Sequence, residues 1–301
     1  MFPYLHDQLS KKFELYYVDG DSELVNLYGT YNFFVAPLVT APEYSAFIKN
    51  IIDKYRIDFY IPLIDEELIR AKSELENYNG VKVMTPSVAF CELSLNKVKL
   101  MQVLHELEIS TIISSSGDNF VWEGDAPVFV KPIYGRGSRG IKKIEDPDQL
   151  EAYYKLEKYE PSQIIIQDYI QGTEYTIGAT VNNLNDLLAI SVKRVIKKKG
   201  ITQIAVLETN ELLTKTVEKV VNLLKPHGPI NIQLYLTADN KVKIFEINPR
   251  FSTTTIMSYA GGVDEIEMYV DFYDTHYTSV PVQPRDNIVL HRRWENVFYE
   301  K

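Results

Sequence analysis

Residues 230–250 read INIQLYLTADNKVKIFEINPR, and this stretch carries the strongest indication of the fold. Two apolar runs, 230–236 and 241–248, lie on either side of the turn-forming residues 237–240. Short apolar runs joined by such a turn predict an antiparallel β-hairpin. A hairpin brings the polar residues of its two strands side by side, so these residues can act together.

Polar oxygens on this hairpin suit a hard cation. Side chains alternate faces along a strand, so Glu246 and Asn248 point to the same side, and Gln233 supplies an oxygen from the neighbouring strand. Carboxylate and amide oxygens are ligands of magnesium. Arg250 follows directly and has the planar fork that matches phosphate. The residues predict a magnesium site, with manganese as an alternative ion; the other interpretation is a sheet edge with solvated polar residues.

Length and composition are those of an ordinary globular protein. The chain has 301 residues, of which 45% are hydrophobic and 24% charged, enough for two or three packed subdomains. Its single cysteine, Cys91, cannot form an internal disulfide, and we expect a buried structural thiol in a reducing compartment. The five histidines lack the spacing of zinc ligands.

The net charge, 32 basic minus 41 acidic residues or −9, disfavours adhesion to nucleic acid or anionic lipid. Apolar runs such as residues 59–64 are too short to span a bilayer, and the N-terminus lacks a signal-peptide pattern. We therefore expect a cytoplasmic protein that acts on small molecules, without nucleic-acid or membrane partners. A homodimer remains open.

The first 88 residues alternate short strands with helices, which predicts a small parallel α/β domain. The expected elements are strands at 13–18, 57–63 and 81–84 and helices at 42–54 and 66–78. Such a domain usually opens with an apolar strand and a glycine turn, whereas this chain opens with an expected helix. Either the natural start lies upstream or the sheet is shortened.

The remaining residues predict a mixed architecture that becomes largely antiparallel. A helix is expected over 94–108 with Lys97 near its beginning, and another over 147–159. Expected strands and a further helix follow: strands 128–132, 141–144, 164–170, 174–181 and 187–195, and helix 211–224. The lysines at 197–199 are interpreted as a solvated loop.

A second phosphate-binding pattern lies upstream of the hairpin. Lys131 ends an apolar strand, and a glycine-rich loop follows: Gly135, Arg136, Gly137, Ser138, Arg139 and Gly140. The glycines let backbone N–H groups turn toward an anion, and the arginines and serine add donors. A strand follows the loop, so it is neither a Walker A nor a Rossmann motif. A purely structural hairpin loop is the alternative.

Together, the lysine strand with its loop, residues 166–175, and Gln233 with residues 246–250 resemble the ATP-grasp superfamily, within it the branch of the carbamoyl-phosphate synthetase large subunit. The resemblance covers roughly residues 85–301. It implies an ATP-grasp fold over 89–301, with two α+β subdomains that clasp ATP, preceded by the α/β domain at 1–88. The implied subdomains are a lid at about 110–170 and a metal-binding and acceptor part at about 171–301.

The resemblance also implies roles for individual residues. Lys97 and Lys131 contact ATP phosphates under the loop Gly135 to Gly140, while Glu174 binds the ribose. The adenine segment comprises Gln167, Asp168, Tyr169 and Ile170, and the magnesium ligands are Gln233, Glu246 and Asn248. The catalytic residues are Arg250, Lys131 and Arg194. Many family members have Glu where this chain has Gln167; the adenine contacts there come chiefly from the main chain, so we expect the change to be tolerated.

The implied activity is ligation of a carboxylate to an amine with ATP and magnesium, through an acyl phosphate. Lysines, arginine and a metal neutralise phosphoryl charge, so no nucleophilic serine, cysteine or histidine is needed. Residues 252–255 and 259–262 are expected to line the acceptor site without naming its substrate. A non-catalytic nucleotide-binding or regulatory module, and a small-molecule kinase, are the alternatives.

Overall fold

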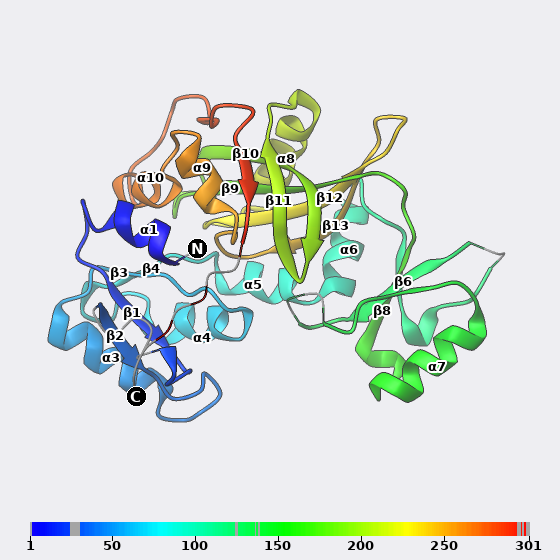
Figure 1. Ribbon diagram of the computed structural model, residues 1–301, viewed down its shortest axis with the longest axis horizontal. Helices are drawn as coiled ribbons and strands as arrows, with labels where there is room; N and C mark the ends of the chain where they lie inside the picture. Colours follow the sequence, from blue (N-terminus) through cyan, green and yellow to red (C-terminus); the bar gives the residue numbers. More distant parts are fainter. Residues whose placement is uncertain are drawn as a thin grey trace. The chain divides into compact units, whose positions relative to one another are not determined.

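The computed structural model describes residues 2–24, 31–123, 126–135, 137, 139–293, 296 and 298. The chain divides into two compact units: unit 1 is Met1–Met84 with Arg292–Lys301, and unit 2 is Thr85–His291 (Figure 1). None of the described helices is long and apolar enough to cross a bilayer.

Unit 1 contains parallel strands, as the sequence predicted, but they form two separate pairs, and the strand Asn32–Val35 was not predicted. β1 (Tyr16–Asp19) pairs with β2 (Asn32–Val35), and β3 (Phe59–Tyr60) with β4 (Lys82–Val83). The described helices are α1 (Phe2–Leu9), α3 (Tyr44–Tyr55) and α4 (Asp65–Leu75). Ile48 and Ile52, one turn apart on α3, share a buried cluster with Ala71 and Leu75 of α4. β3 is shorter than the predicted strand over 57–63.

A six-stranded sheet dominates unit 2, and all its pairings are antiparallel. Its order is β13 (Val242–Asn248), β12 (Ile230–Leu236), β9 (Thr173–Val181), β10 (Leu187–Lys199), β11 (Ile201–Leu207) and β14 (Val289–His291). The predicted hairpins β9–β10 and β12–β13 are confirmed. They set the frame on which the site is built.

The smaller sheet of unit 2 carries the glycine-rich loop. Its order is β5 (Ser114–Ser116), β8 (Ile164–Asp168), β6 (Val128–Pro132) and β7 (Lys142–Ile144). The loop joins β6 to β7, which pair antiparallel. Helix α7 (Pro147–Glu157) begins after Asp146, whose carboxylate accepts from the backbone N–H of Gln149.

One face of the six-stranded sheet forms the main core of unit 2. Helix α8 (Glu211–Leu224) contributes Leu213, Val217, Val220 and Val221, all fully buried. They share a cluster with sheet residues such as Ile177, Ile190 and Ile232. Burying each such side chain stabilises the fold by about 1.5–3 kcal/mol. Because the aliphatic residues occupy this face, the polar residues on the same strands point to the other.

The helix predicted over 94–108 corresponds to α6 (Lys97–Glu106), and a separate helix that was not predicted, α5 (Val88–Leu95), precedes it. Asn96 separates them with φ −91° and ψ 96°, and its side chain accepts from the backbone N–H of Lys99. Asparagine is a favoured N-cap because its side-chain oxygen satisfies an N–H that has no partner within the helix. The break makes Lys97 the first residue of α6.

The predicted end of β10 at residue 195 is also wrong. The strand continues to Lys199, because β11 pairs with it across a turn at Gly200, where φ is +71°. β11 was not predicted. The lysines at 197–199 therefore belong to a paired strand and not to a solvated loop, and backbone pairing outweighs the repulsion among their charges.

Two short helices complete unit 2, α9 (Thr255–Ala260) and α10 (Glu265–Asp271). Cys91 on α5 is buried, as expected, and its thiol donates to the carbonyl of Pro86 at 3.6 Å.

We predict that Gly228→Ala destabilises unit 2. A Cβ at this position lies 2.4 Å from the backbone nitrogen of Pro86 and 2.6 Å from the carbonyl carbon of Thr85, so the backbone must shift. Overpacking of this kind costs about 1–3 kcal/mol. Urea denaturation followed by circular dichroism measures the change. Gly20→Ala is the control because its nearest neighbour is 3.8 Å away; equal midpoints for the two variants contradict the prediction.

Candidate active site

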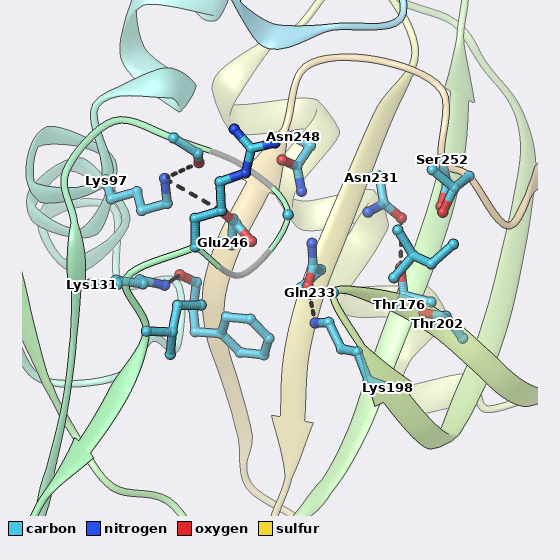
Figure 2. Close-up of a pocket in the computed structure, with 18 of the residues that line it drawn as sticks. Lys97, Lys131, Thr176, Lys198, Thr202, Asn231, Gln233, Glu246, Asn248 and Ser252 are labelled. Carbon is cyan, nitrogen blue, oxygen red and sulfur yellow. Dashed lines mark hydrogen bonds and ion pairs between the residues drawn. The ribbon is translucent and has the colours of Figure 1, made fainter.

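A cavity of about 140 Å³ lies in unit 2 over the β12–β13 hairpin (Figure 2). Most of the residues predicted from the sequence to bind phosphate or metal line it. They are Lys97, Lys131, Gly135, Gly137, Arg139, Gln233, Glu246, Asn248 and Arg250. The structure thus brings the glycine-rich loop and the hairpin, more than 90 residues apart in the chain, to one cavity.

The register of the hairpin places the predicted metal ligands together. Gln233 is the cross-strand partner of Glu246, and Asn231 is the partner of Asn248. Ile247, between the two ligands on β13, is buried in the core. The register shifts between Gln233 and Leu234, which leaves Phe245 without a partner on β12. This irregularity is a β-bulge, and a bulge changes the direction of the strand and of its side chains, here beside the cavity.

A row of polar residues continues across the sheet from this hairpin. Gln233 pairs with Thr176 on β9, and Thr176 pairs with Lys193 on β10. The hydroxyl of Thr176 donates to Asn231 Oδ1 at 2.8 Å, and both residues line the cavity. Lys193 is fully buried 3.6 Å from Glu265 Oε1; burial lowers the pKa of Lys193 and the Glu265 charge opposes that shift. The polar face therefore extends beyond the cavity.

Lys97 connects the glycine-rich loop to the hairpin. Its Nζ donates to the carbonyls of Ile133 at 3.2 Å and Gly135 at 3.0 Å, and lies 3.5 Å from Glu246 Oε1 (Figure 2). The side chain is 7% exposed, so these contacts replace most of its hydration. The N-cap at Asn96 fixes where Lys97 begins α6, and so directs the ammonium into the cavity.

Lys131 enters the same cavity from β6. Its Nζ donates to the carbonyl of Phe245 at 3.2 Å, the residue that the bulge leaves without a strand partner. Burial lowers the pKa of Lys131 to about 8, while Glu246 opposes this and the charges of Lys97 and Lys198 add to it. The Lys131 ammonium is thus buried close to two other cations, Lys97 and Lys198.

Glu246 is the carboxylate that balances these cations. Burial by itself raises the pKa of Glu246, but the charges of Lys131, Lys97, Lys198 and Arg250 outweigh it, so the pKa falls below its usual value. Glu246 is therefore ionised at neutral pH. An ionised carboxylate is what a divalent cation requires as a ligand.

Lys198 is a cavity residue that the sequence interpretation missed. Its Nζ donates to Glu174 Oε1 at 2.6 Å and to Gln233 Oε1 at 2.8 Å. Register shifts occur on both sides of Lys197 in the β10–β11 pair. They interrupt the two-residue alternation, so no periodic signal in the sequence marks Lys198 as inward-facing.

Other predicted residues are not among the described residues that line the cavity. Arg194 donates from Nε to Glu208 at 2.8 Å, and Glu208 also accepts from the hydroxyl of Tyr175. Glu174 accepts a hydrogen bond from the cavity residue Lys198, and its charge also acts on Lys131. The others not among them are Gly140, Gln167, Asp168, Tyr169 and Ile170, while Arg136 and Ser138 lie outside the described residues.

Gln167 is buried on β8, and its side-chain amide donates to Ser114 Oγ at 3.0 Å. Tyr169, just beyond the strand, packs its ring against Phe129 at 5.4 Å between centroids. The roles predicted for residues 167–170 remain predictions.

The predicted acceptor region divides in two. Ser252 and Thr253 line the cavity, whereas Thr254 and Thr255 are buried. Thr255 Oγ1 donates to Glu265 Oε2 at 2.9 Å, which turns it toward the interior. Among the described lining residues, none comes from 259–262.

The residues present fit a magnesium ion that is shared with phosphates. In the described part of the chain no three histidine, cysteine or acidic side chains cluster, which argues against an all-protein metal cage. One carboxylate, Glu246, with the amides of Gln233 and Asn248, leaves coordination positions for phosphate oxygens and water. Magnesium is usually bound in that way.

We predict that Lys131 loses its proton near pH 8, far below an ordinary lysine. Glu246→Gln should lower this pKa further, because the carboxylate favours the ammonium. NMR of protein labelled at the lysine ε-carbons follows the titration, and Lys131→Met assigns the signal. Glu145→Gln, on the exposed surface, is the control. A Lys131 signal that titrates above pH 10, or that rises in Glu246→Gln, contradicts this electrostatic picture.

A family model described as "ATP-grasp in the biosynthetic pathway with Ter operon" matches residues 160–294. The carbamoyl phosphate synthase large chain of Clostridium acetobutylicum is 26% identical over 245 residues, which cover 74% of this chain and 23% of the relative. This chain thus spans less than a quarter of the length of that relative.

Solved structures share the fold at low identity. A biotin carboxylase from Campylobacter jejuni, solved as a beta-gamma-ATP complex, has a TM-score of 0.73 at 15% identity. The match covers 96% of this chain and 71% of the carboxylase chain. An L-amino acid ligase from Bacillus licheniformis has a TM-score of 0.64 at 18% identity, covering 80% and 62%.

These matches confirm the predicted ATP-grasp fold with a small parallel α/β part at the N-terminal side. Residues 160–294 thus match an ATP-grasp family model, and the chain is distantly homologous to the carbamoyl phosphate synthase large chain over most of its length.

Proposed function

We propose that this protein is an ATP- and magnesium-dependent ligase that joins a carboxylate to an amine through an acyl phosphate. One observation carries the proposal. Cations from the loop side and a carboxylate with two amides from the hairpin side line the same cavity.

The charge of the cavity suits a polyphosphate. Among the described residues that line it are the cations Lys97, Lys131, Arg139, Lys198 and Arg250 and one carboxylate, Glu246. In this proposal Lys97 and Lys131 bind the phosphates, and the loop Gly135 to Gly140 covers them. Backbone N–H groups at glycines, where φ is +133° at Gly135 and +70° at Gly137, approach an anion without a Cβ in the way.

The other parts of the nucleotide and its metal are assigned on the same frame. Gln233, Glu246 and Asn248 hold magnesium, which neutralises charge on the phosphates when it is bound. Residues 167–170, at and just beyond the end of β8, meet adenine, and Glu174 meets the ribose. Residues 89–301 then divide into two subdomains: a lid at about 110–170, and a metal-binding and acceptor subdomain at about 171–301.

The reaction balances without a protein nucleophile. A substrate carboxylate oxygen attacks the γ-phosphorus of ATP, the bond to the β,γ-bridging oxygen breaks, and ADP leaves. The amine then attacks the carbonyl carbon of the acyl phosphate, the carbon–oxygen bond to phosphate breaks, and phosphate leaves as the nitrogen loses a proton. The protein positions the reactants and neutralises charge, with Arg250 beside the transferred phosphoryl group.

The relatives support the chemistry without naming the substrates. An L-amino acid ligase and a D-alanine–D-alanine ligase are among the proteins of similar fold. Ser252, Thr253, Thr202 and Asn231 line the cavity and offer hydroxyl and amide groups to the acceptor. The carboxylate and the amine are to be found by screening.

We predict that Glu246→Gln reduces turnover at least about a hundredfold, since one charge contact in the transition state contributes about 3 kcal/mol. Release of ADP and phosphate is measured across a panel of carboxylates with amines, in the presence of magnesium. Circular dichroism checks that the fold is kept. Glu211→Gln, an exposed residue of α8, is the matched control and should keep wild-type turnover.

The same assay separates the alternatives. Failure of the wild type to bind nucleotide with magnesium by calorimetry rules out the proposal. Nucleotide binding without turnover on any substrate pair favours a non-catalytic module. A stable phosphorylated product in place of free phosphate identifies a kinase.

A further inference from the structure

Lys198 makes contacts that a bound nucleotide and metal need for themselves. Its ammonium donates to Gln233 Oε1 at 2.8 Å, as Figure 2 shows, and also to Glu174 Oε1 at 2.6 Å. Gln233 is an assigned magnesium ligand and Glu174 the assigned ribose carboxylate. A single side chain therefore joins both sets of ligands, and its positive charge takes the place of an incoming cation.

The surroundings of Lys198 hold it there. Its side chain is 28% exposed, and the ring centroid of Phe245 lies 5.7 Å from Nζ, within the range of cation–π attraction. Glu174 and Gln233 lie on β9 and β12, which pair directly, so both acceptors are fixed by the sheet. The ammonium thus has two rigid acceptors and an aromatic face.

The charge of the cavity opposes a free divalent ion as long as Lys198 stays. Lys131, Lys97, Lys198 and Arg250 all act on Glu246 and lower its pKa, so a dication beside this carboxylate must face four cations. Like charges repel strongly in a partly buried site, so each of these cations weakens the binding of a dication beside Glu246. A nucleotide brings its own negative charge and removes this obstacle.

The backbone around Lys198 allows it to leave. The β10–β11 register shifts between Val195 and Lys197 and again between Lys197 and Lys198, and the turn at Gly200 has φ +71°. Such irregular strand ends lose ladder bonds and move at lower cost than a regular strand. The lysine can swing out without disturbing the centre of the sheet.

We propose that Lys198 is a built-in substitute for the metal ion. It neutralises Glu174 and occupies the amide oxygen of Gln233 while no nucleotide is bound, excludes a free divalent cation, and is displaced when magnesium arrives together with nucleotide. This inference rests on the proposed function for the identity of the incoming ligand. It adds that the metal binds only together with nucleotide, because a dication alone must displace the lysine against the repulsion of the other cations.

The test measures how tightly the full chain binds Mn²⁺ in the absence of nucleotide. Electron paramagnetic resonance reports the concentration of Mn²⁺ that stays unbound in each titration. Lys198→Met should bind Mn²⁺ at least about tenfold more tightly than the wild type, because one repelling charge is gone and Gln233 is released. Lys198→Arg keeps the charge and should bind Mn²⁺ as weakly as the wild type.

Two further variants locate the effect. Lys199→Met removes the same charge from an exposed neighbour on β10 and should leave Mn²⁺ affinity unchanged. Gln233→Leu combined with Lys198→Met should lose the gain, because the released ligand is absent. Equal Mn²⁺ affinity in Lys198→Met and wild type overturns the proposal, as does a gain of the same size in Lys199→Met.

Failure of this inference and failure of the proposed function give different results. Calorimetry of the wild type with magnesium and a non-hydrolysable ATP analogue tests the function alone. The Mn²⁺ comparison contains no nucleotide, so it reports on Lys198 whatever that calorimetry shows.

Discussion

The ionised carboxylate of Glu246 among Lys97, Lys131, Lys198 and Arg250 is the interaction on which the site depends. The cations lie close together only because this anion balances them, and the anion stays ionised in a buried place only because the cations surround it. Each group comes from a different element: α6, β6, β10 and the segment after β13. The charge balance therefore ties the loop-bearing sheet of unit 2 to the hairpin.

This arrangement requires a sheet with two unlike faces. Ile177, Ile190 and Ile232 pack in the core shared with α8. Residues next to them on the same strands, including Thr176 and Gln233, point to the opposite face of the sheet, toward the cavity or the row of polar residues beside it. Packing supplies the rigidity, and polar residues held on rigid strands keep their spacing. Irregularities occur where function needs them: the bulge at Phe245 gives Lys131 a carbonyl, and the shifts near Lys197 release Lys198 from the strand's alternation.

Local patterns predicted most of the site. Alternation and a tight turn gave the β12–β13 hairpin, and this fixed Gln233 opposite Glu246. The apolar run of β6 and the glycines that follow it predicted a phosphate-binding role for Lys131 and the loop. The errors have local causes. Asn96 capped a new helix inside an apolar stretch, and pairing with β11 drew the lysines at 197–199 into a strand.

By itself the sequence determined the kinds of chemistry present, because glycine-rich loops, lysines and a Glu-x-Asn hairpin are properties of short segments. Only the tertiary structure decided which charges meet. The contacts of Lys198 join it to Glu174 and Gln233 on other strands, and Arg194 pairs with Glu208, just beyond β11, away from the cavity lining. Such contacts depend on register and bulges across the whole sheet, and no short segment encodes them, because each is set by the partner strand.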